Sequence, residues 1–434
     1  MKKYSPYYFA LVSVLLIYSN GLFAQAKIQP APNYLAQVQA LMKNNLVKEA
    51  FVTIDNLEPT TRKEHIELTQ MPAPPFKESV RANYFKKMLE AAGADKVWID
   101  SIGNVLAFRK GKKGTRTVVV DAHLDTVFPE ATDVTVKMKG DTLFAPGIAD
   151  DTRGLIAMLT VLKALEKANI ETTDDVYFVA TVGEEGLGDL RGVKYIVEKK
   201  KIKIDSWIAI DGTAISEIVN GGLGSFRYKA TVLGSGGHSW EAFGIGNPHH
   251  AMAKAVNYFS DEATAFTTTG TKTSFNIGRT GGGTSVNSIP FESWVEVDMR
   301  SESPSQLKKI DSIFKSTMKR GVDDYNKLIK KGTKVTLQLD RIGYRPSGAT
   351  AREQPLVQRA LAALSLFSTT SKLSIQSTNA NTVIANGIPA ISIGAGGKSA
   401  HEHSLEEWWL NEKGADGIKF ALLTLLLEAG VANK

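Results

Sequence analysis

Residues 117–127 of the 434-residue chain have the sequence TVVVDAHLDTV, in which a run of β-branched residues leads to His123 and Asp125. Such a run favours a buried strand. Side chains at positions i and i+2 of an extended chain point to the same side, so Asp125 is expected to reach the ring of His123. A carboxylate in that position fixes the tautomer of a metal-bound histidine. The pair is also compatible with a surface ion pair or with a histidine whose hydrogen bonds are satisfied, so the rest of the chain has to distinguish these interpretations.

Further strands and helices follow the same alternating pattern. Apolar runs predict strands at 176–182, 204–210 and 389–393. Helical spacing of apolar residues predicts helices at 34–57, 78–92 and 155–168. Strands that alternate with helices indicate an α/β fold with a mostly parallel sheet, and such sheets bind ligands beyond the carboxyl ends of their strands. The polar residues that follow these three strands are Glu184, Glu185, Asp211, His401 and His403.

These strand ends, together with one loop, supply a set of candidate metal ligands. The set comprises His123, Asp150, Glu185, Asp211 and one histidine of the pair His401 and His403. Imidazole and carboxylate ligands without a thiolate suit zinc, with manganese or cobalt as alternatives. A catalytic zinc ion usually has three protein ligands, so two ions about 3.5–4 Å apart that share one carboxylate would use all five groups. Glu184, beside a ligand, would then remain free to shuttle protons.

Five motifs occur in the order DAHLDTV, PGIADDTRG, GEEGLGD, IDG and HSLEEW, between about Val118 and Trp408. In this order they resemble those of the co-catalytic zinc peptidases of family M-twenty. That family includes tripeptidase T, glutamate carboxypeptidase, acetylornithine deacetylase and succinyl-diaminopimelate desuccinylase. The resemblance implies a zinc-exopeptidase catalytic domain with a mostly parallel sheet, and an inserted α+β domain that serves as lid and dimerisation domain.

The resemblance also implies a role for each residue of the motifs. One zinc ion would be held by His123, Asp150 and Asp211, and the other by Asp150, Glu185 and His403. Asp125 would orient His123, and Glu184 would be the general base and acid. The family pattern places Asp150 rather than Asp151 as the bridging ligand, and it predicts a cis peptide bond between the two.

One ligand position remains open, and one residue departs from the family pattern. His401 competes with His403 as a ligand, although the spacing to Glu407 and Trp408 favours His403. Asn379 stands where the family more often has an aspartate, which puts a supporting charge in doubt. The remaining histidines, His65, His249 and His250, are expected at the surface or in capping positions.

Residues 221–344 differ from the rest of the chain in their sequence pattern. Their predicted strands alternate between apolar and polar residues, which suits a half-exposed sheet. In this inserted domain, Gly236-Gly237-His238-Ser239 resembles the lid motif of the family, whose histidine stabilises the tetrahedral intermediate, often in the partner's active site. Asn287 and Arg300 match positions that bind the substrate backbone or a terminal carboxylate. In the simpler interpretation, His238 caps a turn and Arg300 pairs with Asp298. The catalytic domain is expected to comprise residues 27–220 and 345–434.

The first residues are typical of a cleaved secretory signal peptide, predicted at 1–24. Two lysines precede a short apolar run at 9–18, which is too short to span a bilayer, and small residues follow it. Removing this segment would lower the formal net charge from +7 to +5. We therefore expect a periplasmic or secreted protein with no membrane attachment after cleavage. The chain has no cysteine, which excludes disulfides and thiol chemistry, and no nucleic-acid-binding motif accompanies its basic clusters.

The predicted function is that of an exported dinuclear zinc exopeptidase acting on short peptides, like a tripeptidase or aminopeptidase, and forming a homodimer through the inserted domain. The alternatives are an amidohydrolase that deacylates N-acyl amino acids, and a carboxypeptidase of the same family. A catalytically inactive binding protein on this fold would have lost a ligand or Glu184, and every such position is filled.

Overall fold

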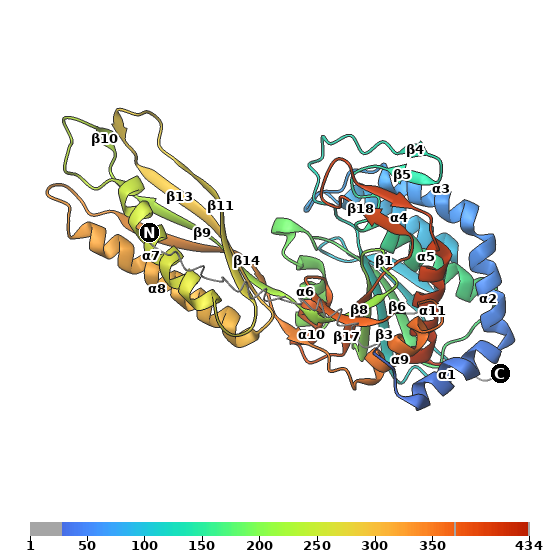
Figure 1. Cartoon of the computed structure of the whole chain (residues 1–434). Helices are drawn as coiled ribbons and strands as arrows, with labels where there is room; N and C mark the ends of the chain where they lie inside the picture. The colour runs from blue at the N-terminus through green and yellow to red at the C-terminus, as the bar shows by residue number, and fades with distance from the viewer. Residues whose placement is uncertain (1–27, 369, 433–434) are drawn as a thin grey trace, which may run out of the picture.

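The computed structural model describes residues 28–368 and 370–432, so the predicted signal peptide lies outside the described residues. Its centre is a nine-stranded mixed sheet (Figure 1). The strands are β1 (Lys96–Ile99), β2 (Val105–Arg109), β3 (Thr117–His123), β6 (Asp175–Thr181), β7 (Ser206–Ile210), β8 (Glu217–Gly222), β15 (Gly348–Ala349), β16 (Lys372–Gln376) and β17 (Ala390–Ile393). They follow the order β1-β2-β6-β3-β7-β17-β8-β15, with β16 also paired to β8.

The middle of this sheet is parallel, as the sequence predicts. β3 pairs in parallel with β6 and β7, and β17 pairs in parallel with β7. The carboxyl ends of β6, β3 and β7, followed by β17, therefore lie next to one another at the same edge. This arrangement confirms the predicted α/β fold class and collects the four polar strand ends at one place.

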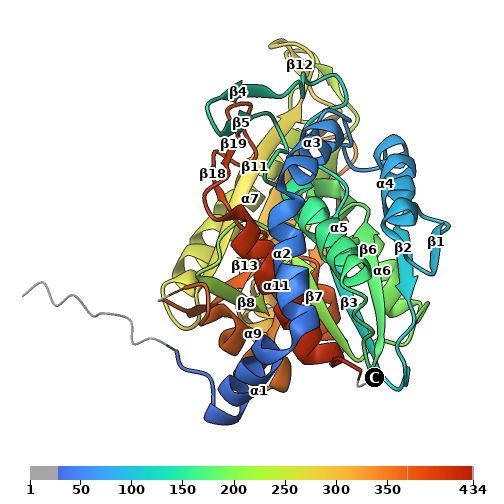
Figure 2. The same ribbon diagram turned by 90° about the vertical axis from the view of Figure 1, so that its right-hand side faces the viewer.

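Helices cover both faces of the sheet because β3 is apolar on both sides. Val118 and Val120 belong to one hydrophobic core and Val119 to another. The first core is covered by α4 (Ser79–Ala92), α5 (Thr152–Lys167), α9 (Pro355–Leu364) and α11 (Gly414–Ala429), with α1 (Pro32–Lys43), α2 (Asn45–Asn56) and α3 (Glu58–Thr69) outside them (Figure 2). The second core is covered by α6 (Arg191–Glu198) and α10 (Ala380–Ala385).

The single helix predicted at 34–57 is two helices in the structure. Asn44 separates α1 from α2, and its side chain accepts a hydrogen bond from the Leu46 N–H at 2.9 Å. An asparagine side chain that accepts a backbone N–H in this way stabilises a new helix N-terminus and competes with the hydrogen bonds of a continuous helix. The break lets α1 pack on α9 while α2 packs on α5.

The chain leaves the central sheet after β8 and returns at β15, and between them it forms a separate lobe (Figure 1). This lobe, called the lid below, has its own hydrophobic core. A four-stranded antiparallel sheet has the order β11-β13-β9-β14, and two long helices cover one face of it. The elements are β9 (Gly224–Leu233), α7 (Pro248–Thr267), β11 (Thr273–Gly282), β13 (Glu292–Ser301), α8 (Pro304–Asn326) and β14 (Thr336–Arg345). At its tip, β10 (Gly237–His238) pairs with β12 (Ser288–Ile289).

A small antiparallel sheet lies beside the central one and contains part of the HSLEEW motif. It has the order β18-β19-β5-β4 and joins residues far apart in the sequence. Its strands are β4 (Lys137–Lys139), β5 (Thr142–Phe144), β18 (Lys398–Ala400) and β19 (Trp408–Leu410). None of the helices in 28–368 and 370–432 has both the length and the apolar character that a bilayer crossing requires.

Candidate active site

A pocket of about 230 Å³ lies at the carboxyl edge of the parallel strands. It contains all five predicted metal ligands and the predicted general base. The described residues that line it are His123, Asp150, Glu184, Glu185, Asp211, Arg227, Arg300, Arg345, Gln376, Ser377, Thr378 and His403. Residues spread over some 280 positions of the sequence thus meet in one place because their strands end at one edge of the sheet.

Asp150 lies at the centre of this cluster, between two histidines. Its Oδ1 is 3.0 Å from His123 Nε2, and its Oδ2 is 3.0 Å from His403 Nε2. His403 Nε2 is also 2.9 Å from Glu185 Oε1. One donor atom each from His123, Asp150 and Glu185 lies within 4.8 Å of the others. Each oxygen of the Asp150 carboxylate therefore faces a different imidazole, which is the arrangement that a shared carboxylate ligand requires.

The structure distinguishes the alternatives that the sequence leaves open. His403 is in the cluster, whereas His401 lies at a neighbouring surface hollow with Leu405 and Trp408. Asp151 turns away from the pocket, and its Oδ2 accepts a hydrogen bond from the His123 backbone N–H at 2.9 Å. The Asp150–Asp151 peptide bond is cis, which confirms that prediction.

The contacts of Asp125 correct the predicted contact with His123. The ring Nδ1–H of His123 donates to the backbone carbonyl of Asp125 at 2.9 Å, while the Asp125 carboxylate lies 3.8 Å away. That buried carboxylate instead accepts the backbone N–H groups of Glu184 and Glu185, at 2.9 and 2.8 Å. Two N–H donors at the end of β6 need an acceptor inside the protein, and Asp125 supplies it. Asp125 thus fixes the His123 ring through its main chain and the Glu184–Glu185 segment through its side chain.

The loop that carries Asp150 is held from behind by a residue whose role the sequence does not reveal. Glu407 is fully buried, and it accepts hydrogen bonds from the backbone N–H groups of Gly147, Ala149 and Asp150 at 2.8, 2.8 and 3.1 Å. Burial raises the pKa of Glu407 to about 7, against the lowering effect of these hydrogen bonds. The family spacing identifies this glutamate, but only the structure shows that it holds the loop.

His65 supports the same loop, and its predicted surface position is wrong. The ring is completely buried, packs edge-on against Trp409, and places Nε2 2.6 Å from the carbonyl oxygen of Ile148. Burial and the charge of Arg153 lower the pKa of His65 to about 3, so the ring is neutral and donates from Nε2. Helix α3 has little amphipathic pattern, so nothing in its sequence separates a buried histidine from an exposed one.

Arg345 is the second residue that sequence reasoning does not find. It ends β14, and its Nη1 donates to Glu184 Oε1 at 2.8 Å and to Ser377 Oγ at 2.9 Å. Its Nη2 donates to the backbone carbonyl of Glu184. Burial and the charge of Glu185 raise the pKa of Glu184, and Arg345 lowers it. The net result is a pKa of about 8. The predicted general base is therefore a buried carboxylate held in place by a buried arginine.

The pKa shifts of Asp211 and of the two histidines show how much negative charge the pocket holds. Burial and the charge of Asp150 raise the pKa of Asp211 to about 7. Burial lowers the pKa of the His123 imidazole, but its hydrogen bond to Asp150 and nearby carboxylates outweigh this and raise it well above its ordinary value. Hydrogen bonds to Asp150 and Glu185 raise the pKa of His403 to about 10. Bound cations would neutralise this surplus negative charge, and the imidazole and carboxylate donors fit divalent ions such as zinc.

Asn379 lies behind the pocket, where the family more often has an aspartate. Its Nδ2 donates to Asp121 Oδ2 at 2.5 Å and to Thr181 Oγ1 at 2.8 Å. The indole N–H of Trp207 donates to the other oxygen of Asp121. A buried carboxylate is therefore present near position 379, but it belongs to Asp121.

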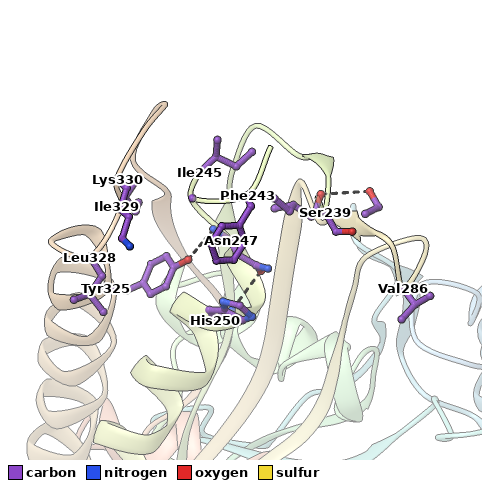
Figure 3. A pocket seen from close by; sticks show the side chains of 13 residues that line it. Ser239, Phe243, Ile245, Asn247, His250, Val286, Tyr325, Leu328, Ile329 and Lys330 are labelled. Atoms are coloured by element: carbon purple, nitrogen blue, oxygen red, sulfur yellow. Dashed lines mark hydrogen bonds between the residues drawn. The ribbon is translucent and has the colours of Figure 1, made fainter. Parts of the chain in front are cut away.

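The predicted lid residues fall into two groups. Arg300 lines the pocket, and its Nε donates to Asp298 Oδ2 at 2.7 Å, so the predicted pairing with Asp298 is present and the substrate-binding role stays a prediction. His238 and Asn287 lie at the lid tip, and neither lines the pocket. There the His238 Nδ1 accepts the backbone N–H of Trp240 at 3.3 Å, a turn-capping contact. Figure 3 shows the neighbouring hollow of this tip, with Ser239, Phe243 and Val286 among its side chains.

Comparisons with known proteins agree with this geometry. A model of the family described as Peptidase family M20/M25/M40 matches residues 119–426. The uncharacterized protein YqjE of Bacillus subtilis is 24% identical over 355 residues, which cover 78% of this chain and 91% of that protein. The structure of aminopeptidase PepT from Bacillus cereus has a TM-score of 0.66 at 21% identity, covering 85% of this chain and 97% of PepT. The di-peptidase Dug1p of Saccharomyces cerevisiae has a TM-score of 0.69 at 15% identity, covering 88% and 98%. At these identities the two structures establish a shared fold.

Proposed function

The chain belongs to peptidase family M20/M25/M40, and we propose that it is an exported exopeptidase that hydrolyses short peptides with two bound zinc ions. Membership confirms the resemblance inferred from the five motifs, and it makes the protein a hydrolase of peptide or amide bonds. The observation that carries the finer proposal is the position of Asp150, whose two carboxylate oxygens face two different histidines.

The five residues predicted as ligands would hold the ions in two overlapping sets. His123, Asp150 and Asp211 would form one set, and Asp150, Glu185 and His403 the other. Divalent cations in this position would supply Lewis acidity, which polarises a carbonyl group and makes water more acidic. Their charge would also lower the pKa of Glu184 from about 8, so that its carboxylate is ionised at neutral pH.

Glu184 would then move the proton that hydrolysis requires. Arg345 binds Oε1 of Glu184, and among the described residues no hydrogen bond occupies Oε2. That oxygen would accept a proton from the attacking water and deliver it to the departing amine. Because Asp125 holds the backbone and Arg345 holds the side chain of this residue, the carboxylate would keep one orientation through both transfers.

Arg300 would bind the substrate carboxylate at the lid side of the pocket. At the lid tip, His238 is too far along the lobe to line the pocket of its own chain, and the proposed homodimer would bring it to the partner's pocket. The exposed apolar residues around it are suited to a contact between subunits. Trp240, Phe243 and Val286 are 84%, 74% and 103% exposed.

The test combines metal analysis with a defined set of substrates. Purified protein without residues 1–24 should contain two zinc ions per chain by mass spectrometry of the metals. It should hydrolyse di- and tripeptides with a free amino terminus and leave their N-acetylated counterparts intact. If only the N-acylated compounds are hydrolysed, the protein is a deacylase and the peptidase assignment is wrong. If carboxyl-terminal residues are released from N-blocked peptides, the protein is a carboxypeptidase. Export is tested separately, by fractionating cells that express the full chain.

A further inference from the structure

The lid side of the pocket carries two arginines that share one acid. Arg227 on β9 donates from Nε to Asp298 Oδ1 at 3.0 Å, and Arg300 on β13 donates from Nε to Asp298 Oδ2 at 2.7 Å. Arg227 and Asp298 are directly paired across β9 and β13, so their side chains and that of Arg300 stand on the same face of the sheet. This is the face opposite to α7 and α8, and it leads into the pocket.

This pair leaves one unmatched positive charge on the lid side of the pocket, opposite the acidic metal-ligand side. One carboxylate neutralises one of the two guanidinium groups, while the third arginine, Arg345, is matched by Glu184. Within the described residues, Arg227 uses Nε and Nη1 for hydrogen bonds and Arg300 uses only Nε. N–H groups on both side chains therefore remain for a ligand. Neither guanidinium is sealed off from solvent, with side-chain exposures of 19% for Arg227 and 39% for Arg300.

Arg227 is held in place by the segment that carries Glu184 and Glu185. Its Nη1 donates to the carbonyl oxygen of Gly186 at 2.9 Å, one residue beyond the ligand Glu185. This contact and the Asp298 contact fix two sides of the guanidinium plane, so the free edge keeps one orientation. An arginine fixed in this way binds a carboxylate with little further loss of side-chain entropy.

The rest of the pocket is mainly polar. Every described residue that lines it is polar or charged. The hydroxyls of Ser377 and Thr378 and the amide of Gln376 complete the wall near the arginines. A leucine or phenylalanine bound there would bury little apolar area against protein, whereas a carboxylate would gain charged hydrogen bonds.

We propose that Arg227 is a specificity-determining residue that selects substrates with an acidic side chain in the residue after the scissile bond. This inference rests on the proposed function, in which Arg300 binds the substrate's terminal carboxylate. A residue that carries both a terminal and a side-chain carboxylate matches two adjacent guanidinium groups that share one internal acid. The substrate class is therefore dipeptides that end in glutamate or aspartate.

The experiment compares kcat/KM for the dipeptides Ala-Glu, Ala-Gln and Ala-Leu with the zinc-loaded enzyme. A charged hydrogen-bonded pair corresponds to a preference of roughly 10- to 100-fold, so Ala-Glu should exceed Ala-Gln by that factor. In Arg227→Gln the Glu/Gln ratio should fall to about 1, and Arg227→Lys should keep part of it. The matched control is Arg279→Gln, since Arg279 lies on the same lid sheet, pairs with Glu296 and is outside the pocket. This control should keep both the ratio and the rate.

The possible results separate this inference from the proposed function. If the wild-type enzyme hydrolyses all three dipeptides equally well, the peptidase assignment stands and the acidic preference is refuted. If Arg227→Gln slows Ala-Glu and Ala-Gln by the same factor, Arg227 only braces Gly186, and its role in selection is refuted. If zinc-loaded protein hydrolyses none of the dipeptides but deacylates N-acyl amino acids, the proposed function itself is wrong.

Discussion

Replacing Glu407 by alanine tests how the loop that carries Asp150 is held. The carboxylate of Glu407 accepts three backbone hydrogen bonds, from Gly147, Ala149 and Asp150, in a fully buried position. Alanine would remove the only acceptor that these three N–H groups have in the described structure. The loop would then have to reorganise or admit water, and in both cases Asp150 would lose its fixed position between the two histidines.

The magnitude follows from two opposing contributions. Each buried N–H left without a partner costs about 1–3 kcal/mol, so three of them cost roughly 3–9 kcal/mol. Against this, burial raises the pKa of Glu407 from 4.5 to about 7, so its ionised form is itself unfavourable by about 3 kcal/mol, and alanine removes that cost. At pH 8 the free energy of unfolding should therefore fall by about 2–4 kcal/mol, taking the middle of the first range.

The assay is urea unfolding of the zinc-free protein at pH 8, followed by zinc titration of the folded variant. Glu407→Ala should lower the urea midpoint and also weaken zinc affinity, because the loop that supplies Asp150 is loosened. Glu406→Ala is the matched control, since this neighbouring glutamate is exposed and should change stability by less than about 0.5 kcal/mol. Equal midpoints and equal zinc affinities for the two variants would refute the supporting role of Glu407.

Three further predictions concern the base, the metal and the buried histidine. Glu184→Gln should lower kcat by ~10²–10⁴ with an unchanged metal content, and full activity in this variant would exclude Glu184 as the proton carrier. Dialysis against a chelator should abolish peptide hydrolysis, and added zinc should restore it; activity that persists in metal-free protein would contradict the proposed site. His65 has a pKa of about 3 when folded and 6.5 when unfolded, so the stability it contributes is complete above pH 6.5 and is lost as the pH falls towards 3. In His65→Gln, whose amide can still donate to the Ile148 carbonyl, unfolding midpoints should depend less on pH across this window, and an unchanged slope would contradict the burial of a neutral ring.

The sequence predicts the strands and their polar ends well because both are local properties. The run before His123 is β-branched, and the ligand is fixed to the end of its own strand. The contacts of Arg345 and Glu184 cannot be predicted in this way, since 161 positions separate the two residues and neither lies in a pattern that names the other. The prediction for His65 is wrong for a related reason, because the burial of its ring depends on Trp409, which lies on a strand distant in the sequence. Local propensity thus predicts where functional groups leave the sheet, whereas tertiary packing determines what holds them.

The segment that carries Glu184 is attached to both ends of the inserted lobe. β9 is the first long strand of the lid and β14 the last, and each contacts this segment. Arg227 on β9 binds the Gly186 carbonyl at 2.9 Å, and the backbone N–H of Tyr344 on β14 binds Asp189 Oδ1 at 2.9 Å. Arg345, the next residue, binds Glu184 itself. A rotation of the lid about these two crossings would therefore move the partners of the base and the substrate-side arginines together. If the lobe closes over the pocket, as a lid would, closure and alignment of the base would be one conformational step, and a substrate that fills the lid side of the pocket should raise kcat as well as lower KM.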